Sequence, residues 1–160
     1  MAVENLLSTA ATLKSQGRLV ERNAAGAPLK IYQQTIEMSA AATNASTYDF
    51  FDIPSDLKIW AIQWRSDDLA TTGSPTIDLG LFHADLASGG DANALLDGLD
   101  VATGALSTIT YDPIGVPGQE AWDYVASQTT DPNQMLTVRA TLQDAACDSG
   151  GTMTLTIIGS

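Results

Sequence analysis

The stretch SDDLATTGSPTIDLGLFHAD, residues 66–85, holds carboxylates and an imidazole, the groups that most often bind metal ions or move protons. These groups belong to Asp67, Asp68, Asp78, Asp85 and His83, the only histidine of the chain. Their spacing does not match a calcium-binding loop, in which acidic residues alternate and a glutamate closes the loop. A tetrahedral zinc site would need two carboxylates beside His83 and the single cysteine, Cys147. We therefore predict no metal site and no cofactor, and a structural cation held by the acidic loops is the open alternative.

Nucleophilic catalysis has no recognisable motif in this chain. A Ser-His-Asp triad would have to use His83, but no G-x-S-x-G turn occurs. The glycine pairs at 89–90 and 150–151 match neither the phosphate-binding nor the dinucleotide-binding fingerprint, and we interpret them as turns. We predict that the chain is not an enzyme and has no small-molecule substrate. A hydrolase with two carboxylates in a cleft stays open, because the sequence does not show which acidic residues converge.

The three tryptophans suggest a different function, that of a carbohydrate-binding module, since exposed aromatic rings can stack on sugars. Trp60, Ile62 and Trp64 alternate along the most apolar segment, which predicts that they share one face of a strand. We expect that face to lie in the core or an interface. Trp122 lies in a separate segment, and Cys147 is interpreted as a free thiol without a task.

The charge of the chain excludes several partners. Nineteen acidic and seven basic residues give a net charge of −12, which repels nucleic acid and anionic membrane surfaces. No apolar run approaches the roughly 20 residues that span a bilayer, so we predict no membrane segment. One cysteine and no charged-then-apolar leader indicate maturation in a reducing cytoplasm.

The first 27 residues differ from the rest. Residues 1–30 carry four basic and two acidic residues, 4 − 2 = +2, whereas the remainder carries 3 − 17 = −14. Apolar residues spaced by three and four from Val3 to Leu13 indicate a short amphipathic helix, and the Gly- and Ala-rich stretch to Pro28 indicates a linker. We predict an N-terminal arm, residues 1–27, partly helical or extended, followed by one domain, residues 28–160.

That domain shows the two-residue period of β-strands. The predicted strands cover residues 29–39, 48–53, 57–65, 75–82, 107–111, 121–126, 134–143 and 152–159. Clusters such as TTGSP, ASGGDAN and DSGG separate them as turns, and LLDGLD, residues 95–100, is predicted as a helical turn. The pattern predicts an all-β fold, an antiparallel β-sandwich or jelly roll of about eight strands.

One long segment carries a family resemblance. The run YDFFDIPSDLKIWAIQWRSDDLATTGSPTIDLGLFHAD, followed by the GG pair and LLDGLD, resembles capsid decoration, or cement, proteins of tailed bacteriophages. The similarity covers residues 48–100, about a third of the chain, and each of its motifs is also ordinary strand-and-turn chemistry. The resemblance implies a β-sandwich or jelly-roll core and transfers no active residue.

The function implied by the resemblance is that of a virion structural protein on the capsid exterior, assembled in the host cytoplasm. Such a protein binds the major capsid protein and bridges capsid subunits, and a homotrimer is the expected oligomer. We expect the arm to supply the contact, through the apolar and basic residues Val3, Leu6, Leu7, Lys14, Arg18 and Arg22. The alternatives are another phage component, such as a tail protein or head–tail connector, or the carbohydrate-binding module.

Overall fold

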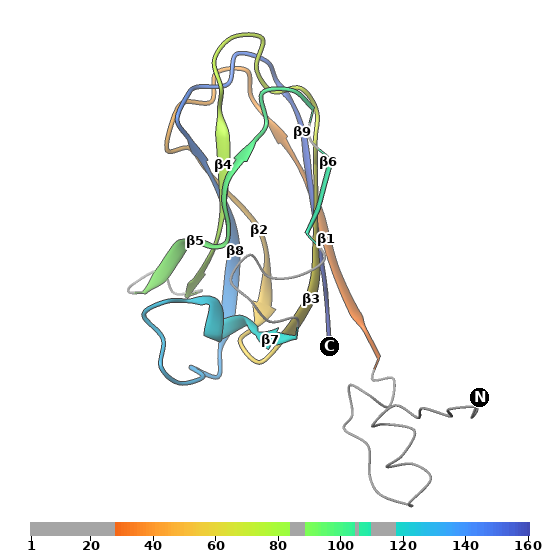
Figure 1. Ribbon diagram of the computed structural model, residues 1–160, viewed down its shortest axis with the longest axis vertical. Helices are drawn as coiled ribbons and strands as arrows, with labels where there is room; N and C mark the ends of the chain where they lie inside the picture. Colours follow the sequence, from red (N-terminus) through yellow and green to blue (C-terminus); the bar gives the residue numbers. More distant parts are fainter. Residues whose placement is uncertain (1–27, 84–88, 105, 110–117) are drawn as a thin grey trace, which may run out of the picture.

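The computed structural model describes residues 28–83, 89–104, 106–109 and 118–160. These residues form two antiparallel β-sheets packed face to face (Figure 1). The predicted contact residues in the arm, Val3 to Arg22, lie outside the described residues.

The first sheet has the strand order β1–β9–β3–β6. Its strands are β1 (Lys30–Met38), β9 (Gly151–Gly159), β3 (Lys58–Ser66) and β6 (Leu106–Ile109). The two-residue β7 (Gln119–Glu120) also pairs with β3, at Lys58 and Ile59. The pairing of β1 with β9 runs without interruption from Lys30 opposite Gly159 to Met38 opposite Gly151.

The second sheet has the order β2–β8–β4–β5. Its strands are β2 (Thr47–Pro54), β8 (Met135–Gln143), β4 (Thr76–His83) and β5 (Gly90–Asp100). Both outer strands of this sheet are irregular: the register shifts once between β2 and β8, and twice between β4 and β5. A bulge of this kind bends a strand and interrupts its hydrogen-bonding edge.

The connectivity is that of a jelly roll. The chain pairs β1 with β9, β2 with β8, β3 with β6 and β4 with β5, alternately in the first and the second sheet. It therefore resembles one long hairpin rolled up into two sheets, which is the arrangement of eight-stranded jelly rolls. The predicted all-β sandwich or jelly roll of about eight strands is confirmed.

The core lies between the sheets and follows the predicted alternation. In β9 the inward residues Met153, Leu155 and Ile157 are fully buried, while the threonines between them are half-buried. The same alternation buries Ile77, Leu79 and Leu81 of β4 and Leu136, Val138, Ala140 and Leu142 of β8. Fully burying a side chain of this size contributes about 2 kcal/mol, so these alternating strands account for much of the driving force for folding.

Two predicted elements are wrong. The LLDGLD stretch is part of β5 and not a helical turn; bulges blur its period, and Gly98 adopts the left-handed backbone (φ 67°) inside it. Residues 121–126 contain a 3₁₀ helix, Ala121–Tyr124, where a strand was predicted. The N–H groups of Ala121 and Trp122 donate to the carbonyl oxygens of Leu57 and Ser55, so this segment caps a loop and pairs with no strand.

The predicted face of Trp60, Ile62 and Trp64 is also wrong in part. Ile62 and Trp64 are buried, but Trp60 is half-buried and its indole Nε1 donates to the Ser160 hydroxyl at 3.0 Å. The cause is a register shift between Ile59 and Ala61, which turns Trp60 away from the core. One extra residue in β3 is therefore enough to make a prediction of buried residues from strict alternation fail.

Candidate functional site

The outer face of the first sheet is polar but nearly uncharged. Residues directly opposite each other in paired strands point to the same side, so the register defines its rows. One row is Gln33, Thr156 and Gln63, and the next is Thr35, Thr154 and Arg65. The Thr35 and Thr154 hydroxyls lie 2.9 Å apart, within hydrogen-bonding distance.

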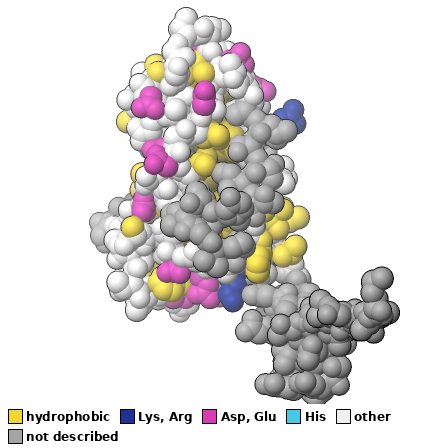
Figure 2. Space-filling view, viewed as in Figure 1, with side chains coloured by type: hydrophobic (Ala, Val, Ile, Leu, Met, Phe, Trp, Pro, Cys, Tyr) yellow, Lys and Arg dark blue, Asp and Glu magenta, His cyan; other side chains and the backbone are white. Residues whose placement is uncertain are grey.

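This face ends in an apolar patch where the chain enters β1. Ile31, Ile158 and Ala61 form the row at this end. Ile31 is 66% exposed and the nearby Leu29 is 61% exposed, so two large aliphatic side chains are exposed at the same end of the sheet. Figure 2 shows hydrophobic side chains gathered near this end of β1. The patch therefore lies directly beside the junction with residues 1–27.

The outer face of the second sheet is acidic. Its strands contain six aspartates and one basic residue, Arg139, a balance of 1 − 6 = −5. The aspartates are Asp49, Asp52, Asp78, Asp91, Asp97 and Asp100. The first sheet, with β7, carries Lys30, Lys58 and Arg65 against Glu37 and Glu120, a balance of 3 − 2 = +1. Acidic side chains accordingly line the β4–β5 side of the molecule in Figure 2.

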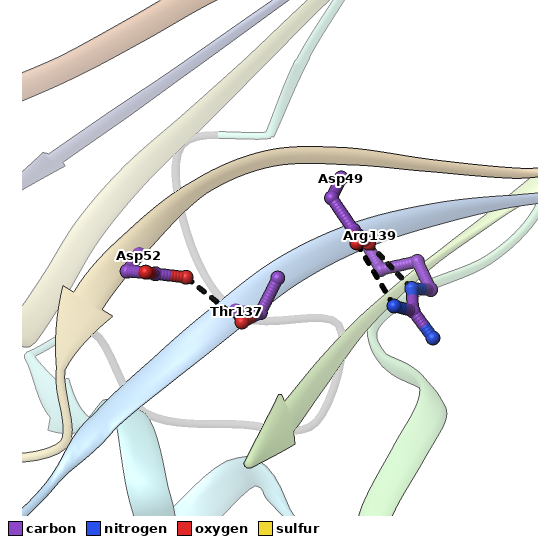
Figure 3. A network of polar contacts seen from close by, with 4 residues as sticks. All are labelled: Asp49, Asp52, Thr137 and Arg139. Atoms are coloured by element: carbon purple, nitrogen blue, oxygen red, sulfur yellow. Dashed lines mark hydrogen bonds and ion pairs between the residues drawn. The ribbon is translucent and has the colours of Figure 1, made fainter. Parts of the chain in front are cut away.

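Arg139 is fully engaged by its neighbours. Its Nε and Nη2 donate to the two carboxylate oxygens of Asp49, the second at 2.9 Å (Figure 3). The guanidinium also lies 4.8 Å from the centre of the Phe82 ring. The hydrogen bonds from Arg139 to Asp49 raise the pKa of Arg139 above its usual value. Nearby, the Thr137 hydroxyl donates to Asp52 at 2.8 Å, so this patch is a positioned network.

Other aspartates hold loops together. The Asp148 carboxylate accepts from both the backbone N–H and the hydroxyl of Thr71 and Thr72, at 2.5–3.1 Å. The Asp67 carboxylate accepts from the N–H and hydroxyl of Thr152, both at 2.8 Å. These hydrogen bonds favour the charged form, so the pKa of Asp148 and that of Asp67 are lowered from 3.8. Both carboxylates are structural clamps.

The described aspartates of residues 66–85 therefore hold turns and loops in place. Asp68 accepts from the N–H of Ala70 two residues on, a turn that aspartate often makes. Asp78 accepts from the N–H of Gly98 at 2.8 Å. Asp85 lies outside the described residues. Within the described ranges, no group of three or more His, Cys, Asp and Glu side chains is arranged to hold a metal ion. The role of Asp148 was not predicted, because nothing local in the sequence shows that its loop meets residues 71–72.

His83, at the end of β4, is buried, with 6% of its surface exposed. Gln128 lies 2.6 Å from its Nε2, and Gln134 contacts its Nδ1. Both ring nitrogens are therefore occupied by amide side chains, which are not the carboxylate and hydroxyl partners of a triad histidine. The imidazole serves to fasten the start of β8 to the end of β4.

The three tryptophans and Cys147 are likewise packed or hydrogen-bonded within the domain. Trp64 is fully buried and packs edge-on against Phe50, 5.7 Å between ring centres. The Trp122 indole donates to Glu120 at 2.8 Å, as Trp60 does to Ser160. Cys147 is buried, and burial together with nearby Asp148 raises the pKa of its thiol, which disfavours the reactive thiolate. These contacts give little support to a sugar-stacking platform.

A shallow depression of about 260 Å³ lies between the end of β2 and the start of β8. It is lined by Pro54, Ser55, Asp56, Asn133, Gln134 and Met135. The Ser55 hydroxyl, which is buried, donates to Asp131 at 2.6 Å and accepts from the N–H of Gln134 at 3.1 Å, so it fastens the two loops together. In the described part of the chain, no helix is long and apolar enough to cross a membrane. The broad sheet faces, and not a cleft, are the prominent candidate sites.

Comparison with known proteins gives similarity in fold. Neither a family model nor a curated protein matches the sequence. Among solved structures, a chain of the cyanophage Pam1 capsid asymmetric unit aligns with TM-score 0.56 and 18% identity, covering 82% of this chain and 83% of that one. A chain of the Ralstonia phage GP4 capsid aligns with TM-score 0.57 and 17% identity over the same shares. The jelly-roll sandwich of this chain is therefore a fold also found in chains of two phage capsids, in agreement with the resemblance in its sequence.

Proposed function

We propose that this chain is a non-enzymatic virion protein that binds the outer surface of a phage capsid and bridges its major capsid protein subunits. The observation that carries the proposal is the alignment with chains of two phage capsid structures over more than four-fifths of both partners. Because the aligned share is as large in those chains as in this one, the whole sandwich is the matched unit.

The surface of the domain supports the proposed role. The apolar patch around Leu29 and Ile31 adjoins residues 1–27, so arm and patch can form one continuous contact. In the arm, Val3, Leu6 and Leu7 would supply apolar anchors, and Lys14, Arg18 and Arg22 would meet an acidic capsid surface. The acidic second sheet would face solvent and keep decorated particles from associating. The resemblance also implies a homo-oligomer.

Co-sedimentation with mature capsids stripped of their outer proteins tests the proposal. The unaltered chain should sediment with the capsids, and more weakly at high salt, because exposed charge pairs are screened. The variant with Lys14, Arg18 and Arg22 all changed to Glu should bind at least tenfold more weakly. A matched variant with Asp52, Asp97 and Asp100 changed to Asn alters three charges on the second sheet and should bind as before. Absence of binding by the unaltered chain would shift the role to a tail or connector protein.

A further inference from the structure

The four outer strands of the two sheets differ in how well their free edges are protected from pairing with another chain. A free strand edge offers unpaired N–H and C=O groups, and proteins usually blunt it with bulges, prolines, charges or shortness. β2 has a bulge, two aspartates and Pro54; β5 has two register shifts and three aspartates; β6 has four residues. β1 has nine residues, unbroken pairing with β9 and no proline. Within the described residues β9 is its only strand partner, so its second edge is an open template.

The same side of the sandwich exposes part of the core. Tyr32 and Ile36 of β1 and Tyr48 and Phe51 of β2 are half-buried side chains packed against the core. The rings of Tyr32 and Phe51 lie 5.8 Å apart across the two sheets. These four residues form an apolar seam directly under the open edge of β1.

The sequence of β1, KIYQQTIEM, complements itself when two copies run antiparallel. With Gln34 on the two-fold axis, all nine residues pair, and Tyr32 lies opposite Ile36 of the second copy. Aromatic and β-branched residues form favourable cross-strand pairs, and Tyr32 and Ile36 both point to the core side of the sheet.

Charge also favours this arrangement. Lys30 is at the start of β1 and Glu37 is next to its end, with no charged residue between them. In this register Lys30 lies opposite Met38 and Glu37 opposite Ile31 of the second copy, so each end of the paired strands carries one basic and one acidic side chain, on opposite faces of the sheet. Parallel pairing would bring like charges together at each end. The nearly neutral first sheet, balance +1, allows two copies to approach from this side despite the net charge of −12.

We propose that β1 is a homodimerisation strand: two copies of the chain join their β1 edges antiparallel about Gln34, forming one continuous sheet across both sandwiches and covering the seam. The contact is isologous, so it gives a two-fold dimer and not a trimer. The inference does not use the capsid proposal, and its tests contain no capsid, so either proposal can fail alone.

Sedimentation equilibrium of the full chain at micromolar to submillimolar concentrations is the first test, and it should give a reversible monomer–dimer equilibrium. A monomer over the whole range, or a trimer, would overturn the proposal. The location of the contact is then tested by cross-linking with a short bismaleimide. Gln34→Cys should cross-link, because directly opposite Cβ atoms in paired strands are about 5 Å apart. Gln63→Cys should not, because five strand spacings of about 4.8 Å would separate the two copies.

Both cysteine variants retain buried Cys147, so they have the same background. A dimer in which Gln34→Cys does not cross-link would show that another surface pairs. The charge pattern is tested by exchange: Lys30→Glu or Glu37→Lys alone gives each end of the paired strands two like charges and should raise the dimer dissociation constant about fivefold at low salt. The double variant K30E/E37K again gives the two ends of β1 opposite charges and should return the dissociation constant to within about twofold of the original. A double variant weaker than either single one would contradict antiparallel pairing, with circular dichroism confirming that each variant is folded.

Discussion

The two sheets of this sandwich bury similar side chains but present different surfaces. The first sheet shows threonine and glutamine in regular rows, with a charge balance of +1, and its β1–β9 pairing is unbroken. The second sheet has a balance of −5, and both of its outer pairings are bulged. A face that must bind another protein benefits from low desolvation cost, whereas a face that must stay in water benefits from carboxylates. In the proposed function, the first sheet belongs to the contact side and the second sheet to the solvent side.

The largest expected effects test whether the inner faces really are equivalent. Leu155 in β9 and Leu79 in β4 are both fully buried, one in each sheet. Leu155→Ala and Leu79→Ala should each lower the free energy of unfolding by about 3 kcal/mol, because each leaves a cavity in the shared core. Urea unfolding measures both. A loss below about 1 kcal/mol for one of them would mean that the two sheets do not share one core equally.

A smaller effect is expected where the second sheet is bulged. The α-carbon of Gly80 in β4 lies so close to β5 that an added Cβ would overlap the backbone of Asp91 and Ala92. Gly80→Ala should therefore cost about 2 kcal/mol, because β5 must move away. Gly104→Ala is the control, since its Cβ would meet its nearest atom at 3.4 Å. Equal stability of the two variants, measured by urea unfolding, would show that β5 can move away from β4 at little cost in free energy.

The loop clamps should give an acid-dependent effect. The pKa of Asp148 is lowered in the folded protein, so its ionised form stabilises the fold at pH above the unfolded value, near 3.8, and this contribution is lost as the pH falls through the folded value. Asp148→Asn should lower the melting temperature at pH 7, and the difference from the unaltered chain should shrink below about pH 4. Thermal melts at pH 7, 5 and 3 check this. A difference that stays constant with pH would assign the loss to altered packing and not to the charge.

The smallest effect concerns the acidic face itself. Arg139 is its only basic residue, and its bridge to Asp49 is partly exposed, with side-chain exposures of 17% and 50%. Arg139→Gln should cost about 1 kcal/mol, because both the bridge and the contact with Phe82 are lost. Asp52→Asn, which removes one negative charge from the same face and leaves an acceptor for Thr137, should stay within about 0.5 kcal/mol. A larger loss for Asp52→Asn would mean that this face is held together by its carboxylates.

The parts of the fold that alternate strictly were predictable from sequence. In β4, β8 and β9 apolar residues recur at every second position, and these alternating residues are buried in the core. The prediction fails where one residue interrupts the period: at the bulge beside Trp60, and in β5, where two shifts and Gly98 conceal a strand. Whether a strand forms a bulge depends on its pairing with the neighbouring strand, so the local sequence pattern does not reveal it.

The candidate site was less predictable for a related reason. The polar face of the first sheet exists only because β1 adds Gln33 and Thr35, and β3 adds Gln63, to the rows of the β9 threonines. The role of Asp148 as a clamp depends on two loops meeting at one end of the sandwich. The predicted contacts from Val3 to Arg22 lie outside the described residues, so they stay predictions.

The position of β9 has a consequence for how the protein is made. β9 lies between β1 and β3 in the first sheet, although among the described strands β1 is synthesised first and β9 last. Until Gly151–Gly159 has left the ribosome, β1 and β3 lack their common neighbour, and the first sheet cannot close. Folding must then wait for contacts between distant parts of the chain, which makes it slow compared with helical domains of this size. During that interval the open strands are exposed to aggregation, and a chaperone that shields them would raise the yield of soluble protein.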